Sequence, residues 1–273
     1  MPGFITRDET TIFYKDWGTG QPVVFSHGWP LDGDAWDAQM MHLAAKGFRV
    51  IAHDRRGHGR SSQTWTGNDM ATYADDLIQL IEHLDLHDSM LVGHSTGGGE
   101  VALVAAHFGT SRVSKVVLVS AVTPSMVRST NNPEGIPIEV FDGIRAAVMK
   151  DRSQYYRDFT TMFFGANRDG STVTQGMRDS FWLQGMAGSI QGQYECIKAF
   201  SETDFSDALR ALKMPVLIIH GDDDQVVPLE ITARRAAGLV SNVTLKIYPG
   251  AAHATPNTEA ARLNADLVDF ARL

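Results

Sequence analysis

The chain has 273 residues and a formal net charge of −8, with 43% hydrophobic and 21% charged residues. A chain of this length can bury a substantial core, and one α/β domain with an inserted cap is common at this size. The acidic balance, without a basic arm or a lysine-rich run, argues against nucleic acid or an anionic membrane as a partner. It favours an enzyme that acts on small molecules.

The sequence also bears on the compartment. Cys196 is the single cysteine, so no intramolecular disulfide can form. Residues 1–8 show no charged-then-apolar signal pattern, and no apolar run approaches membrane-spanning length. We therefore expect a cytoplasmic protein without a membrane partner.

The first half of the chain alternates between strand and helix patterns. Residues 3–17 predict a hairpin whose antiparallel strands lie at one edge of a sheet. The next segments are predicted, in chain order, as strand 22–27, helix 35–46, strand 49–53, helix 70–84, strand 89–94, helix 96–108 and strand 114–120. This alternation predicts an α/β fold with a doubly wound, mostly parallel sheet and helices on both faces.

The alternation stops in the middle of the chain. Residues 124–207 carry many aromatic side chains on helix-like segments without a clear buried strand, and strand patterns return at 215–221 and 243–248. We predict an α/β core from residues 1–123 and 208–273, and a helical cap from residues 124–207 that overhangs the site.

A nucleophile motif lies at the end of one predicted strand. Gly93-His94-Ser95-Thr96-Gly97 follows the apolar run 90–92 and opens a helix. This strand, turn and helix context is that of a nucleophile elbow, with Ser95 held in a strained turn above the sheet. The alternative is a glycine-rich helix start that lets helix and sheet pack closely, a purpose that Gly98 and Gly99 would serve.

An acid and a base follow in the order Ser, acid, His. Strand 215–221 runs into Asp222-Asp223-Asp224, and strand 243–248 is followed by a turn that contains His253. We expect Asp222 to organise the turn, Asp223 to be solvated, and Asp224 to orient His253, which takes the proton of Ser95. A capping aspartate and an ordinary loop histidine are the alternatives, but their joint occurrence in this order favours a catalytic triad.

The segment after the first core strand predicts an oxyanion loop. Phe25-Ser26-His27-Gly28-Trp29-Pro30 follows the apolar strand Pro22-Val23-Val24, and the backbone N–H groups of Trp29 and Thr96 are predicted to bind the developing oxyanion. Pro30 donates no N–H, and its ring restricts Trp29 to an extended or turn conformation. His27 is interpreted as a structural histidine.

Apolar side chains of the cap and of the triad loops are candidates for substrate contact. These residues are Trp29, Pro30, Met126, Phe141, Phe159, Phe163, Phe200, Val226 and Val227. His53 and His58 lack a carboxylate set at ligand spacing, so no metal site is expected. No Rossmann glycine pattern or P-loop is present, and we expect no cofactor.

Several longer segments together resemble one family, the α/β-hydrolase family of bacterial non-haem haloperoxidases and arylesterases. The matching segments are Ser26-His27-Gly28-Trp29-Pro30, Ala52-His53-Asp54-Arg55-Arg56-Gly57-His58-Gly59-Arg60-Ser61-Ser62, Gly93-His94-Ser95-Thr96-Gly97-Gly98-Gly99-Glu100, Ile138-Glu139-Val140-Phe141-Asp142-Gly143 and His220-Gly221-Asp222-Asp223-Asp224-Gln225-Val226-Val227-Pro228. The resemblance points to the same triad. The sequence departs from the family pattern at Ala252 and Ala254, which flank His253.

We therefore predict a cofactor-free serine hydrolase that cleaves carboxylic esters through an acyl-enzyme. The resemblance further implies a perhydrolase or haloperoxidase side activity, with a carboxylic acid and peroxide as substrates, and a possible homo-oligomer. Hydrolysis of a γ-lactam by the same triad is one alternative. A non-enzymatic small-molecule receptor with this fold is another.

Overall fold

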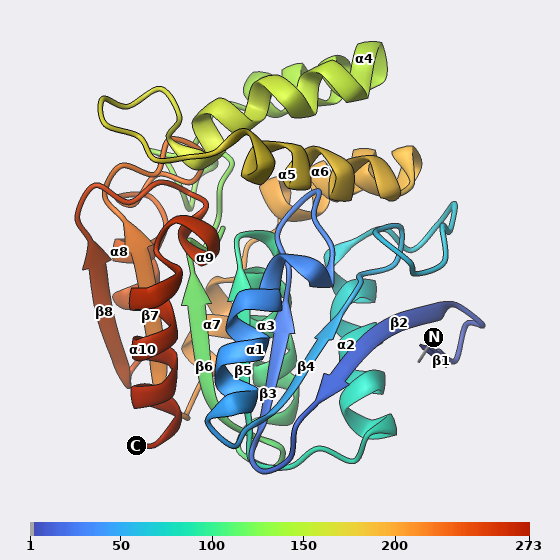
Figure 1. The fold of residues 1–273 in the computed structure, drawn as a ribbon, viewed down its shortest axis with the longest axis vertical. Coiled ribbons are helices and arrows are strands. Elements are labelled where there is room, and N and C mark those ends of the chain that lie inside the picture. Colours follow the sequence, from blue (N-terminus) through green and yellow to red (C-terminus); the bar gives the residue numbers. More distant parts are fainter. Residues whose placement is uncertain (1–2) are drawn as a thin grey trace.

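A computed structural model describes residues 3–273, and one eight-stranded sheet forms its centre (Figure 1). The first two residues of the predicted core lie outside the described part. The strand order is β1-β2-β4-β3-β5-β6-β7-β8. The strands are β1 (Gly3–Ile5), β2 (Thr11–Trp17), β3 (Pro22–Ser26), β4 (Arg49–His53), β5 (Ser89–His94), β6 (Val113–Val119), β7 (Val216–Gly221) and β8 (Val243–Tyr248). β1 and β2 form the antiparallel edge, and the other strands are parallel.

Helices cover both faces of the sheet. The elements outside the sheet are η1 (Gly33–Trp36), α1 (Asp37–Ala45), α2 (Met70–His83), α3 (Thr96–Phe108), α4 (Ile138–Phe164), α5 (Gln175–Ala187), α6 (Ile190–Glu202), α7 (Ser206–Ala211), α8 (Ala233–Ala237), α9 (Thr255–Thr258) and α10 (Ala260–Ala271). Helices α1 and α10 pack on one face, and α2, α3, α7 and α8 pack on the other.

The central strands carry continuous apolar runs, such as Val116–Val119 of β6, because both of their faces are covered there. In β6, Val116 and Leu118 pack toward α2 and α3, whereas Val117 and Val119 pack toward α1 and α10. Successive side chains on a strand point to opposite faces, so an unbroken apolar run fills two cores at once.

A third layer lies above the carboxyl ends of the strands, where α4, α5 and α6 cross the sheet (Figure 1). These three helices belong to the segment predicted as the cap, while α7 spans its predicted end at residue 207 and packs on α3. Aromatic side chains of α4–α6 share one apolar cluster with Trp29, Leu31 and Tyr73 of the core. The segment predicted as the cap is therefore joined to the rest of the fold by packing around Trp29.

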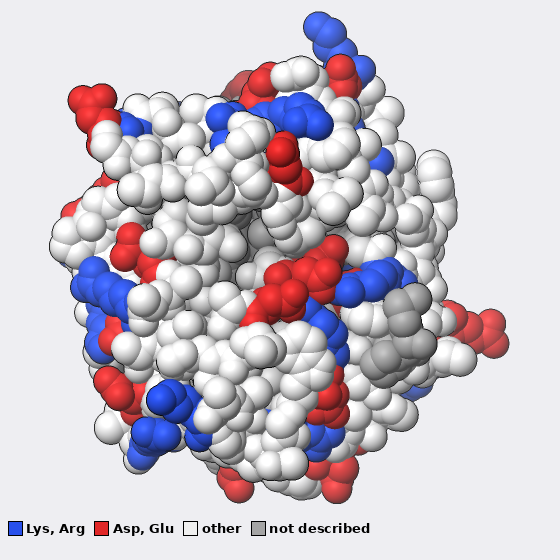
Figure 2. All heavy atoms as spheres, viewed as in Figure 1, with Lys and Arg blue, Asp and Glu red and all other residues white. Residues whose placement is uncertain are grey.

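The surface bears both signs of charge. On the face drawn in Figure 2, Lys and Arg side chains are scattered among Asp and Glu rather than gathered into one basic stripe. Among residues 3–273, no helix combines the length and the apolar character needed to cross a bilayer.

Candidate active site

Ser95 lies in the sharp turn between β5 and α3. Its backbone has a φ of +53° and a ψ of −118°, a conformation that side chains rarely adopt and that tight surrounding packing must enforce. A Cβ on Gly97 would lie 2.3 Å from the carbonyl oxygen of Ser26, and one on Gly93 would lie 2.2 Å from that of Gly97. Glycine at both positions lets the turn close, and the turn projects Ser95 above the sheet.

Ser95, His253 and Asp224 form one hydrogen-bonded chain. His253 Nε2 lies 3.0 Å from Ser95 Oγ, and His253 Nδ1 lies 2.7 Å from Asp224 Oδ2. The acid stands in the loop after β7 and the histidine in the loop after β8. Because Nδ1 donates to the carboxylate, Nε2 is left to accept the hydroxyl proton. The arrangement can thus convert the hydroxyl into a nucleophile.

The carboxylate of Asp224 is buried and saturated with hydrogen bonds. Its Oδ1 accepts from the amides of Val226 and Val227 at 2.9 and 2.8 Å, and His220 Nε2 lies 3.3 Å from Oδ2. Burial by itself would raise the pKa of this carboxyl, but the charges and hydrogen bonds of His253 and His220 hold the pKa well below its usual range. Asp224 is therefore charged at neutral pH.

Two neighbouring histidines were given no role by the sequence analysis. His94 donates from Nε2 to the carbonyl oxygen of His253 at 3.0 Å, and the two rings lie 4.9 Å apart. Burial, followed by the nearby charge of His253, lowers the pKa of His94 to about 3, so its ring is neutral. His220, at the end of β7, donates to the carbonyl oxygen of Val227 at 2.8 Å. The only sign of these two contacts in the sequence was the position of each histidine at the end of a predicted strand.

The predicted oxyanion loop lies directly against the elbow. A Cβ on Gly28 would stand 2.8 Å from His94 Nδ1 and 3.1 Å from Ser95 Cβ. Within residues 3–273, the backbone N–H groups of Trp29 and Thr96 have no hydrogen-bond acceptor, and both residues line the same cavity as Ser95. The indole N–H of Trp29 is held by the carbonyl oxygen of Gln193 at 2.9 Å.

A buried ionic network ties this loop to α3. Arg55 Nε donates to Glu100 Oε2 at 2.7 Å, and Arg55 Nη2 donates to the carbonyl oxygen of His27 at 2.8 Å. The Arg55 amide donates to His27 Nε2 at 2.9 Å, which places His27 inside the network. Burial opposes the charge of Glu100, but Arg55 and His53 lower the pKa of this carboxyl to about 2. Both members of the ion pair stand in motifs used for the family resemblance, yet the sequence did not pair them.

A small apolar cavity of about 50 Å³ adjoins Ser95. Seven of the nine residues proposed for substrate contact line it: Trp29, Met126, Phe141, Phe159, Phe200, Val226 and Val227. Pro30 does not, because its ring lies against Gly185 of α5. Phe163 also lies outside and packs edge-on against His253, at 5.1 Å between ring centroids. Val122 and Ile144 line the cavity but were not predicted.

The three consecutive aspartates after β7, residues 222–224, make different contacts. Asp222 Oδ1 accepts a hydrogen bond from the Gly250 amide at 2.6 Å and so links the loops that follow β7 and β8. Asp223, expected to be solvated, is 30% exposed, and its carboxylate also accepts two hydrogen bonds from the guanidinium of Arg168. The partner lies in the cap, 55 residues away in the chain, and no local pattern reveals it.

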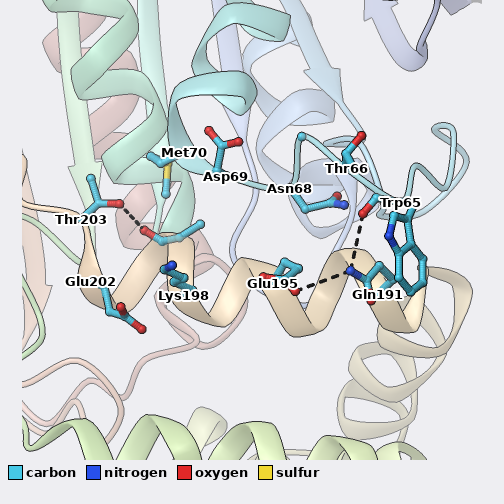
Figure 3. A pocket seen from close by; sticks show the side chains of 12 residues that line it. Trp65, Thr66, Asn68, Asp69, Met70, Gln191, Glu195, Lys198, Glu202 and Thr203 are labelled. Atoms are coloured by element: carbon cyan, nitrogen blue, oxygen red, sulfur yellow. Dashed lines mark hydrogen bonds between the residues drawn. The ribbon is translucent and has the colours of Figure 1, made fainter.

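A larger groove lies elsewhere, between α6 and the segment 65–70 (Figure 3). The groove has a volume of about 610 Å³. None of Ser95, His253 and Asp224 lines it. Polar groups on its walls bind each other, as where Gln191 Nε2 donates to the carbonyl oxygen of Trp65 at 3.4 Å. In the part of the chain that the structure describes, no cluster of three or more His, Cys, Asp or Glu side chains could hold a metal ion.

Comparison with known proteins places these features in context. The profile of the alpha/beta hydrolase fold family matches residues 21–259. A non-heme haloperoxidase of Rhodococcus erythropolis is 54% identical over 99% of both chains. A bifunctional esterase/perhydrolase of Acinetobacter calcoaceticus is 50% identical, also over 99% of both. The structure of a bromoperoxidase from Bacillus anthracis matches with a TM-score of 0.93 at 39% identity, covering 97% of this chain and 96% of that one.

Proposed function

The chain belongs to the alpha/beta hydrolase fold family, and we propose that it is a serine carboxylic ester hydrolase in which Ser95 is the nucleophile. The single observation that carries the proposal is the chain of hydrogen bonds from Ser95 through His253 to the buried Asp224. The names of the relatives support the reaction class, because they combine esterase, perhydrolase and haloperoxidase activities.

In the acylation half, His253 Nε2 takes the proton of Ser95 as Oγ attacks the ester carbonyl. The amides of Trp29 and Thr96 donate to the oxyanion of the tetrahedral intermediate, and charged Asp224 stabilises the imidazolium. His253 then passes the proton to the departing alcohol, or to the departing hydroxyl group, which leaves as water, where the acyl donor is a carboxylic acid. An acyl group remains on Ser95.

In the second half, water or hydrogen peroxide attacks the acyl-enzyme. His253 removes a proton from the attacking molecule, the Ser95 ester bond breaks, and the proton returns to Oγ. Water gives the carboxylic acid, whereas hydrogen peroxide gives the peracid. A peracid, one halide ion and one proton give the carboxylic acid and a hypohalous acid, so halide oxidation can follow in solution from the released product.

The size of the cavity favours short acyl groups. Its volume of about 50 Å³ is small beside the roughly 300–1,000 Å³ of sites that enclose drug-sized ligands. Its walls are almost entirely apolar, apart from Ser95, Thr96 and His253. Acetyl and propionyl esters are therefore the proposed substrates, and acetic acid with peroxide the proposed perhydrolysis pair. No observation in the cavity favours a γ-lactam or a receptor role.

One experiment tests both activities. The protein is assayed for p-nitrophenyl acetate hydrolysis, and for bromination of monochlorodimedone in acetate and hydrogen peroxide. Ser95→Ala is expected to lower both rates by at least about three orders of magnitude, because both use the same acyl-enzyme. Ser114→Ala, at a partly exposed serine of β6, is the matched control. Bromination that survives Ser95→Ala would contradict the shared intermediate.

A further inference from the structure

The end of α4 contacts both loops that carry the acid and the base. We call residues 163–168 the cap latch; it contains the last two residues of α4 and the turn beyond them (Figure 1). The carbonyl oxygen of Phe163 accepts a hydrogen bond from the Ala254 amide at 2.9 Å. The latch therefore holds the residue directly after His253.

The same latch holds the acid loop on both sides of Asp224. Arg168 donates from Nε and Nη2 to the two carboxylate oxygens of Asp223. Asn167 and Gln225 exchange a pair of side-chain amide hydrogen bonds at 3.0 and 3.1 Å. Because residues 223 and 225 flank the acid, these two contacts fix the path of the backbone that presents Asp224.

Other contacts bind the two loops only to each other. Asp222 Oδ1 accepts from the Gly250 amide at 2.6 Å, and the Asp223 amide donates to the carbonyl oxygen of Ala251 at 3.3 Å. The latch differs because it joins both loops to the cap, which also supplies the aromatic walls of the acyl cavity. A movement of α4 is thus transmitted to the two loops as well as to the cavity.

The Arg168–Asp223 pair of the latch contributes little to global stability. The side chains of Arg168 and Asp223 are 48% and 30% exposed, and ion pairs this exposed stabilise a fold only weakly. Two parallel hydrogen bonds from a guanidinium nevertheless fix direction as well as distance. The guanidinium of Arg168 is therefore suited to holding the loop that carries Asp224 in one orientation.

We propose that Asn167 and Arg168 are positioning residues that keep Asp224 aligned with His253 and make this alignment depend on the docked position of the cap. The inference rests on the proposed function, because it requires Asp224 and His253 to act on Ser95. Neither latch residue touches substrate. Each acts through the loop that it holds.

The primary test is Arg168→Gln, measured with p-nitrophenyl acetate. We expect kcat to fall about 10-fold because small misalignments of catalytic groups slow chemistry strongly, while KM changes less than about 2-fold because the acyl cavity is untouched. Arg234→Gln is the matched control, since it removes a comparable exposed pair between Arg234 of α8 and Glu230, and neither residue lines the cavity beside Ser95. We expect this control to leave kcat within about 2-fold.

Two further readouts separate alignment from simple structural damage. The downfield proton resonance of the His253 Nδ1 hydrogen bond is expected to shift or broaden in Arg168→Gln and to stay unchanged in Arg234→Gln. Added salt is expected to lower kcat of the wild type by screening the Arg168–Asp223 pair, and to affect Arg168→Gln less. The reversed pair Arg168→Glu with Asp223→Arg should recover part of the activity lost in Arg168→Glu alone.

The outcomes distinguish this inference from the proposed function. If ester hydrolysis survives Ser95→Ala, the proposed function fails and the latch loses its role with it. If hydrolysis requires Ser95, yet Arg168→Gln and Asn167→Ala both match the wild type in kcat and in the Nδ1 proton resonance, only the latch is wrong. The latch proposal would also be overturned if Arg168→Gln and Arg234→Gln lost kcat equally and the His253 Nδ1 proton resonance of Arg168→Gln were unaltered.

Discussion

The core and the cap meet at the same cavity, but they hold their side chains by different forces. On the core side, Ser95, His253 and Asp224 are joined by directed hydrogen bonds of 3.0 and 2.7 Å, and backbone amides fix the carboxylate. On the cap side, the lining is apolar: Phe159 and Phe200 both pack against Trp29, with ring centroids about 6 Å apart. In the proposed function, the reaction depends on the direction of these hydrogen bonds, whereas the choice of substrate depends on the shape of the apolar lining.

The two regions also differ in how they respond to pH. All ten histidines of the chain lie outside residues 124–207, and several of them are buried around the oxyanion loop and the elbow. The segment predicted as the cap therefore contains no histidine. This division lets the two halves of the site be altered separately.

The largest effect is expected from the acid of the core. Asp224→Asn should lower kcat by about four orders of magnitude and leave the fold intact, because an amide cannot stabilise the imidazolium and imposes the wrong tautomer on His253. Steady-state hydrolysis of p-nitrophenyl acetate, with circular dichroism to monitor folding, measures this effect.

The neighbouring aspartates are the controls for that change. Asp222→Asn keeps an acceptor for the Gly250 amide and should cost little. Asp223→Asn should resemble Arg168→Gln, since it breaks the same ion pair. If either control loses as much kcat as Asp224→Asn while remaining folded, the acid has been assigned to the wrong residue.

Local patterns were enough to predict the fold and the hydrogen-bonded chain. Strand periodicity located the parallel sheet, and the turn motif around Ser95 contains the two glycines, Gly93 and Gly97, that let the elbow close. The Arg168–Asp223 pair could not be read in this way, because it joins segments that only packing of α4 brings together. Pro30 and Phe163 show the same limit: each lies near the cavity in sequence or in space, but α5 covers one and His253 the other.

A second prediction concerns the histidines buried in the core. Burial, aided by Arg55, lowers the pKa of His27 well below its usual value and that of His58 to about 3, and burial lowers that of His94 to about 3. The folded protein leaves these rings neutral, whereas the unfolded chain protonates them below about pH 6.5. Their contribution to stability is therefore complete above pH 6.5 and is lost as the pH falls toward 3.

Asp32 changes the pH dependence of stability in the direction opposite to that of the three histidines. Burial, followed by the charge of Asp54, raises the pKa of this carboxyl to about 7, so its contribution is complete below about pH 4 and is lost as the pH rises to 7. Taken by themselves, these three histidines and Asp32 leave about two more protons on the unfolded chain than on the folded protein between pH 4.5 and 6. The free energy of unfolding should then fall by about 2–3 kcal/mol for each pH unit of acidification.

Urea unfolding across this pH range measures the slope. His58→Asn keeps a side-chain donor for the carbonyl oxygen of Arg56 and removes one titrating group, so the slope should decrease by about 1 kcal/mol per pH unit. His107→Asn, at an exposed position of α3, should leave the slope as it is. An unaltered slope in His58→Asn would mean that the ring is already protonated in the folded protein.

The smallest effect is expected from the cap. Ile144 of α4 is half-buried and lines the acyl cavity, whereas Val148, one turn further along the same helix, is buried and does not line it. Ile144→Ala should enlarge the cavity and raise kcat/KM for p-nitrophenyl butyrate relative to the acetate by about 10-fold, since extra room for methylene groups changes binding by about 1–3 kcal/mol. Val148→Ala should lower the free energy of unfolding about as much as Ile144→Ala does. It should leave the ratio of kcat/KM for the butyrate to that for the acetate unchanged. An equal change in the ratio from both variants would mean that selectivity follows the general looseness of α4, and the division between a core that sets chemistry and a cap that sets size would no longer hold.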